Sequence, residues 1–113
     1  MARSGKTNFG HIIRKMKTEI ASCLSGKNNL LAVYGFGSFF RGSDSYSDID
    51  LLVVCQDNAD DALELYYHVL RNFRFKESLI NVPIDITFLS LSEFRSRPLR
   101  DMAELVPLWH IND

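Results

Sequence analysis

Three aspartates stand at strand-like positions of the sequence, where acidic side chains are uncommon. Asp48 and Asp50 lie two residues apart at the mouth of the apolar run LLVV, and Asp85 interrupts the apolar run VPIDITF. Strands disfavour aspartate, and burying its charge is costly. We therefore expect a ligand that offsets this cost, and a divalent cation is the obvious candidate.

The spacing of these acids is suited to phosphoryl transfer. Because side chains alternate along a strand, Asp48 and Asp50 share one face, with Cα atoms about 6.5 Å apart. Aimed at a common point, their carboxylates can bridge ions about 3.5–4 Å apart, as in two-metal sites. If the second strand is a neighbour, Asp85 joins them, and three carboxylates that repel one another favour Mg²⁺, which takes oxygen ligands.

A phosphate-binding half of the site is predicted upstream, in the sequence YGFGSFFRG. Gly37 allows the backbone to approach a ligand closely, and free N–H groups at a helix start attract phosphate oxygens. The Ser38 hydroxyl can donate one more hydrogen bond. Two roles are possible for Arg41: it could neutralise the charge of a leaving pyrophosphate, or it could brace the loop from behind. The sequence favours neither role.

Each part of this pattern has an ordinary structural explanation when taken alone. A glycine-serine pair is usually a turn, and a strand acid can protect a sheet edge. The conjunction of all the parts favours the phosphoryl-transfer interpretation. The segment SGKT near the N-terminus resembles the tail of a P-loop, but no strand leads into it and the first glycine of the motif would precede Met1.

These residues resemble the nucleotidyltransferase superfamily that includes DNA polymerase β, and most of all its minimal nucleotidyltransferases, or MNT domains. The hallmark of that family is Gly-Ser, then an Asp-x-Asp strand start, then a third Asp on a later strand. Here those positions are Gly37-Ser38, Asp48-Ile49-Asp50 and Asp85. The resemblance covers roughly residues 30–89, and the loop after Arg41 is a residue shorter than the family pattern.

The resemblance implies an α/β (α+β) fold, with a small mixed β-sheet flanked by helices and a metal site on the face away from them. It implies that Asp48 and Asp50 bind two Mg²⁺ ions, and that Asp85 binds the catalytic ion and helps to activate the attacking hydroxyl. Gly37 and Ser38 would bind phosphate. The implied reaction moves a nucleoside monophosphate from an NTP, with ATP expected, to a hydroxyl acceptor.

The resemblance also implies a partner protein. Stand-alone MNT proteins are often antitoxins paired with a helical HEPN-type toxin, and some transfer an adenylyl group to a hydroxyl on it. Two other interpretations stay open: a non-catalytic antitoxin that acts by contact alone, and a nucleotide-sensing module that binds NTP without transfer. A homo-oligomer is also open.

Apolar periodicity predicts the elements that must position these residues. We expect helices over 9–24, 38–41, 58–73, 91–97 and 99–105, strands over 30–36, 48–55 and 82–89, and an edge strand or extended tail over 106–111. Either Ser90 or Ser92 is expected to cap the helix that begins at Leu91. A flexible N-terminus (1–8) would precede a single domain (9–113).

The composition limits the remaining choices. A chain of 113 residues that is 46% hydrophobic and 24% charged fits one compact domain. The net charge of −1 supplies no global basic field, so nucleic acid is not a required partner. Cys23 and Cys55 are expected to be reduced thiols. Without a signal-like or membrane-spanning run, we expect a cytoplasmic protein with no membrane partner.

Overall fold

The computed structural model describes residues 5–42, 48–58, 60–72, 83–96 and 104–112. Its elements are, in chain order, α1 (Gly5–Leu24), β1 (Leu30–Phe36), α2 (Gly37–Phe40), β2 (Ile49–Cys55), α3 (Ala62–Asn72), β3 (Ile84–Ser90), α5 (Leu91–Arg95) and β4 (Val106–His110).

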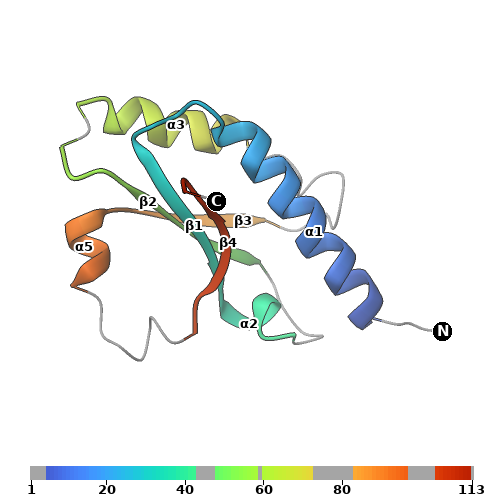
Figure 1. Ribbon diagram of the computed structural model, residues 1–113. Coiled ribbons are helices and arrows are strands. Elements are labelled where there is room, and N and C mark those ends of the chain that lie inside the picture. Colours follow the sequence, from blue (N-terminus) through green and yellow to red (C-terminus); the bar gives the residue numbers. More distant parts are fainter. Residues whose placement is uncertain (1–4, 43–47, 59, 73–82, 97–103, 113) are drawn as a thin grey trace.

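The strands form one mixed sheet in the order β3-β2-β1-β4 (Figure 1). β1 runs antiparallel to β2 and to β4, whereas β2 and β3 are parallel and are joined through α3. A parallel pair needs such a crossover connection. The expected small mixed sheet flanked by helices is confirmed. Of the two expectations for residues 106–111, the edge strand is correct, because Val106–His110 pairs with β1.

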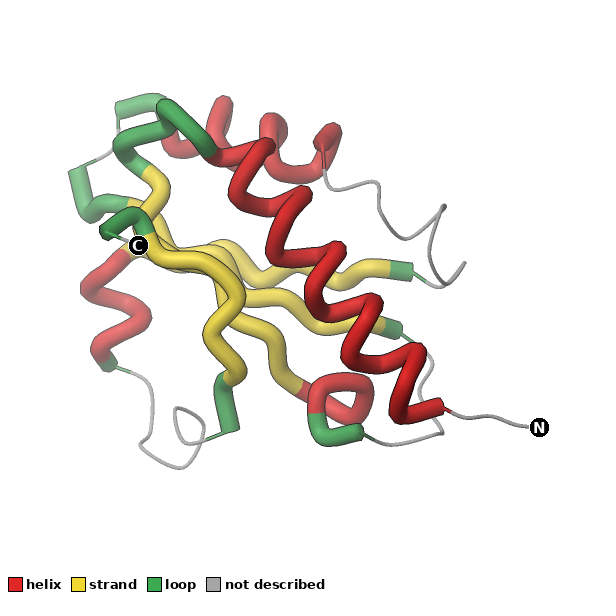
Figure 2. The backbone as a smooth tube through the Cα atoms, turned by 45° about the vertical axis from the view of Figure 1, so that its right-hand side comes forward, coloured by secondary structure: helices red, strands yellow, loops and turns green. Residues whose placement is uncertain are grey.

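α1 and α3 cover one face of the sheet (Figure 2). α1 buries an apolar stripe formed by Ile12, Met16, Ile20 and Leu24, which follow one another at the helical spacing of four residues. These side chains join a single core cluster with inward residues of the strands and of α3, among them Leu30, Val33, Ile49, Leu51, Val53, Cys55, Leu65 and Val69. This core fixes which face of each strand points away from the helices.

A polar contact also joins the two helices. The Nε2 atom of His68 on α3 lies 3.0 Å from the Cys23 carbonyl oxygen of α1 and 3.7 Å from the Cys23 Sγ. Cys23 and Cys55 are both free thiols, as expected. Burial raises the pKa of each thiol, which favours the protonated form. The structure therefore gives these cysteines a packing role.

The opposite face of the sheet carries a smaller apolar cluster, centred on Ala32, Leu52 and Val54. Phe94 of α5 packs here, with its ring stacked on that of Tyr34 at a centroid distance of 5.3 Å. Ser90 caps α5 in a capping box, in which its Oγ accepts from the Glu93 N–H and its own N–H donates to the Glu93 carboxylate. Ser90 is therefore the cap that the sequence left undecided.

Element ends differ from the sequence prediction where local turns decide them. α1 includes residues 5–8, which the pattern places in a flexible N-terminal segment, because a nucleated helix propagates until a strong breaker stops it. α3 begins only at Ala62, because Asp61 is held in the preceding turn by a 3.0 Å hydrogen bond from Asn29 Nδ2. The helix expected over 99–105 falls largely outside the described residues. In the part of the chain that is described, no helix has the length and apolarity needed to cross a bilayer.

Candidate active site

The parallel pairing of β2 and β3 brings the three acids together. Asp50 is the register partner of Asp85, and Asp48 immediately precedes β2. One carboxylate oxygen of each of the three lies within 4.8 Å of the others. The structure thus places Asp85 beside Asp48 and Asp50, as expected.

Side-chain alternation aims these acids away from the core. Ile49 and Leu51, which alternate with the acids along β2, are fully buried in the core under α1 and α3. Asp48 and Asp50 are half-buried, and Asp85 is exposed. The apolar residues therefore anchor each strand on one face, and the carboxylates emerge on the other face.

The electrostatics of the cluster favour a bound cation. Burial raises the pKa of Asp50, and the neighbouring charges of Asp48 and then Asp85 raise it further. Each of these causes disfavours the carboxylate form, and a positive ion would reverse the balance.

The donor set fits magnesium. All three donors are carboxylate oxygens, which hard cations such as Mg²⁺ prefer. Two oxygens on one Mg²⁺ lie at most about 4.2 Å apart, given bond lengths of about 2.1 Å. A spread of up to 4.8 Å is therefore within a small side-chain adjustment of one ion, or suits a pair of ions. Within the described residues, no other group of three His, Cys, Asp or Glu side chains converges in this way.

Gly37 packs directly against this cluster. Its φ of 84° lies in the left-handed region that side chains disfavour. A Cβ atom at this position would also collide with the Oδ2 atom of Asp50. Only glycine meets both demands, so the backbone at the start of α2 passes unusually close to the carboxylates. Phe39 and Phe40 fix α2 in place, because both rings are buried.

The start of α2 has no side-chain cap. Its N-cap residue, Phe36, is extended and makes no side-chain capping hydrogen bond, and the first N–H groups of a helix have no acceptor within it. Ser38 is the second residue of α2 and is half-buried. Glycine and serine therefore stand where the sequence predicts them, beside the strand that carries Asp50.

Arg41 lies at the end of α2 and contacts a residue that the sequence did not suggest. Its Nη1 atom is 3.4 Å from the Oε1 atom of Glu104, and the two side chains are 59% and 62% exposed. An ion pair this exposed contributes little stability and exchanges readily. Glu104 is 63 residues away in sequence, so no local pattern could have identified it.

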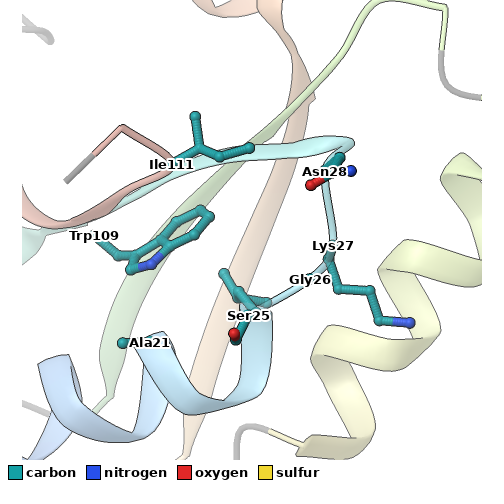
Figure 3. A pocket seen from close by; sticks show the side chains of 8 residues that line it. Ala21, Ser25, Gly26, Lys27, Asn28, Trp109 and Ile111 are labelled. Atoms are coloured by element: carbon teal, nitrogen blue, oxygen red, sulfur yellow. The ribbon is translucent and has the colours of Figure 1, made fainter.

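A separate cavity of about 260 Å³ lies at the other end of β1, where α1 turns into the strand (Figure 3). Trp109 and Ile111 line it from the end of β4, and Ser25 and Asn28 line it from the turn. Lys27 extends away from the Trp109 ring (Figure 3). The cavity contains none of the three acids, so it is distinct from the acidic site.

Comparisons with known proteins found a matching family and similar structures. A family model described as polymerase beta, nucleotidyltransferase matches residues 18–97. A candidate nucleotidyltransferase from Sulfolobus solfataricus has a similar crystal structure, with a TM-score of 0.64 and 25% identity over 100% of this chain and 93% of that one. No protein of curated function matches the chain.

Two further similar structures are toxin-antitoxin systems. A mutant MntA-HpeT toxin-antitoxin has a TM-score of 0.51 and 21% identity, over 83% of this chain and 72% of that one. A toxin-antitoxin crystallised with AMP-PNP has a TM-score of 0.50 and 22% identity, over 83% and 73% of the two chains. At this level of identity the two structures share the fold with this chain.

Proposed function

The chain belongs to the polymerase β nucleotidyltransferase family, and on that premise we propose that it is a Mg²⁺-dependent enzyme that transfers AMP from ATP to a hydroxyl group. The observation that carries this proposal is the convergence of three carboxylates within 4.8 Å on the open face of the sheet. Their mutual repulsion is a cost to the fold that a purely structural cluster would have no reason to keep.

The three acids would have different tasks. Asp48 and Asp50 would bind both metal ions, and Asp85 would bind the ion next to the attacking hydroxyl. When bound, Mg²⁺ would lower the pKa of that hydroxyl and neutralise charge on the phosphates. The hydroxyl oxygen then bonds to the α-phosphorus, the bond to the bridging oxygen breaks, pyrophosphate leaves, and the hydroxyl proton passes to solvent.

Gly37 and Ser38 would hold the β- and γ-phosphates, with the N–H groups at the start of α2 and the serine hydroxyl as donors. The lack of a capping side chain at Phe36 supports this, because no N-cap side chain competes with a ligand for the N–H groups of Gly37 and Ser38. Arg41 would leave its weak contact with Glu104 and pair with the leaving pyrophosphate. Positioning and charge neutralisation of this kind account for most of the catalysis of phosphoryl transfer.

The acceptor hydroxyl is proposed to belong to a partner toxin of the HEPN type, which would make this chain an MNT-type antitoxin. The structural likeness to MntA-HpeT supports a toxin partner, and the likeness to a complex with AMP-PNP supports ATP as the donor. The acids lie on the face of the sheet opposite α1 and α3, so a partner could reach them without displacing either helix.

Transfer can be measured with α-labelled ATP, Mg²⁺ and the protein encoded next to this one. We expect the neighbour to become labelled with release of pyrophosphate, and Asp50→Asn to reduce the rate by at least about 100-fold, as is typical for loss of one charge-stabilising group. Asp60→Asn is the matched control, since it makes the same chemical change at an exposed position before α3.

The same experiment separates the alternatives. Binding of the neighbour without labelling, unchanged by Asp50→Asn, would favour the non-catalytic antitoxin. ATP binding without pyrophosphate release would favour the nucleotide-sensing module. Labelling that survives Asp50→Asn would refute the role given to the acids.

A further inference from the structure

The outer surface of α3 carries an apolar stripe formed by Leu63, Tyr67 and Leu70. These side chains are 65%, 49% and 42% exposed, and no other large hydrophobic side chain is exposed among those whose burial the structure describes. Their spacings of four and three residues align them along one side of the helix. Single exposed leucines are ordinary, but an aligned set confined to one helix is typical of a contact surface.

The central ring of the stripe is held in place. The Tyr67 ring lies 5.6 Å from that of Tyr66, and the Tyr66 ring makes an edge contact with Phe88 of β3 at 5.5 Å. A side chain that is already ordered loses little entropy when a second surface covers it. Tyr67 is therefore suited to be the centre of an interface.

The charges beside the stripe indicate what covers it. Glu64 and Arg71 are exposed and lie on the same flank of the stripe, one on each side of Tyr67 along the helix. They are about 10.5 Å apart along the axis. If a second α3 packs antiparallel about a two-fold axis at Tyr67, Glu64 of each copy meets Arg71 of the other. A parallel arrangement would not bring these two flanks together.

We propose that α3 is a self-association surface, through which two copies of this chain form an antiparallel dimer centred on Tyr67. Such an interface is self-complementary, as two-fold symmetry requires. It lies on the face of the sheet opposite the three acids, so both acidic sites stay accessible in the dimer. The stripe is small beside the standard interface of roughly 800 Å² per partner, so we expect a dimer in roughly the micromolar range.

Sedimentation equilibrium over micromolar concentrations, with circular dichroism to verify folding, tests the proposal. We expect Tyr67→Glu to weaken the dimer at least about tenfold, the effect of burying a charge at its centre. Glu64→Arg and Arg71→Glu should each weaken it a few-fold, and the double variant should recover the wild-type affinity to within about twofold. Glu19→Arg, the same charge change at an exposed position of α1, is the control and should have no effect.

Three results would overturn the proposal. The first is that the wild-type protein is monomeric at every concentration measured, even if Tyr67 then binds a different protein. The second is a dimer that Tyr67→Glu leaves intact. The third is a double charge variant that associates no better than the single variants.

Discussion

Replacing Asp50 with asparagine should stabilise the metal-free protein while it abolishes transfer. Carboxylate oxygens of Asp48 and Asp85 lie within 4.8 Å of one from Asp50. Two unit charges at that distance repel by about 0.9 kcal/mol in a water-like dielectric, and 0.15 M salt reduces this to about 0.5 kcal/mol. Asp50 experiences two such repulsions, so its neutralisation should contribute about 1 kcal/mol, or about 4 °C in Tm for a domain of this size.

The pH dependence of this effect follows from the direction of the pKa shift. Folding raises the pKa of Asp50, chiefly through burial and then through its two acidic neighbours. The folded state therefore binds the proton more tightly than the unfolded state, and the destabilisation is fully present above the raised pKa. It is lost as the pH falls through that pKa towards the ordinary aspartate value of about 3.9. The advantage of Asp50→Asn should be constant near pH 7 and should shrink in the acidic window just above pH 4.

Thermal unfolding in EDTA measures the effect of the repulsion on the metal-free protein, and unfolding in Mg²⁺ measures the stabilisation by the bound ion. Mg²⁺ at ten times its Kd should stabilise the wild type by about 1.4 kcal/mol, and this gain should be much smaller in Asp50→Asn. Asp60→Asn should leave both the Tm and the Mg²⁺ response unchanged. A lower Tm for metal-free Asp50→Asn, or an equal rise for Asp60→Asn, would refute the reasoning, because the repulsion would then not be located at the cluster.

Three other substitutions test the surroundings of the site. Gly37→Ala should destabilise the fold by about 1–3 kcal/mol in urea unfolding, through its left-handed φ and the collision with Asp50, and Gly10→Ala should not. Ser90→Ala should cost about 1 kcal/mol by removing the cap of α5, without a change in KM for ATP. Glu104→Gln should change stability by less than about 1 kcal/mol, and it should lower KM for ATP if its partner is released to bind phosphates.

Local patterns in the sequence were sufficient to predict where Asp48, Asp50 and Gly37 lie in the site. The alternation that places Asp48 and Asp50 on one face needs only the knowledge that their segment is a strand, and the apolar run after them supplies it. Gly37 was expected to allow close backbone approach, and the structure shows that the approached group includes Asp50 itself. The catalytic and binding roles of these residues stay a prediction until transfer is measured.

Long-range pairing was beyond the reach of the sequence. Asp85 reaches the cluster only because β3 is the neighbour of β2 and pairs in a register that aligns it with Asp50. The alternation of Asp85 with Ile84 and Ile86 fixes which face of β3 packs on the core. Nothing within that strand, however, identifies β2 as its neighbour or aligns Asp85 with Asp50. The contact between Arg41 and Glu104, and the late start of α3, depend in the same way on segments far apart in the chain.

The two faces of the sheet explain why the cluster can be tolerated at all. On one face, inward residues such as Leu51 and Val53 are fully buried against the helices and hold the strands in register. That register then imposes the closeness of the acids on the other face, where repulsion alone would drive them apart. The core thus supplies the free energy that keeps the carboxylates together before any ligand arrives. Substitutions in the core should therefore weaken Mg²⁺ binding only as far as they loosen the pairing of β2 and β3, whereas substitutions of the acids should remove binding and leave that pairing intact.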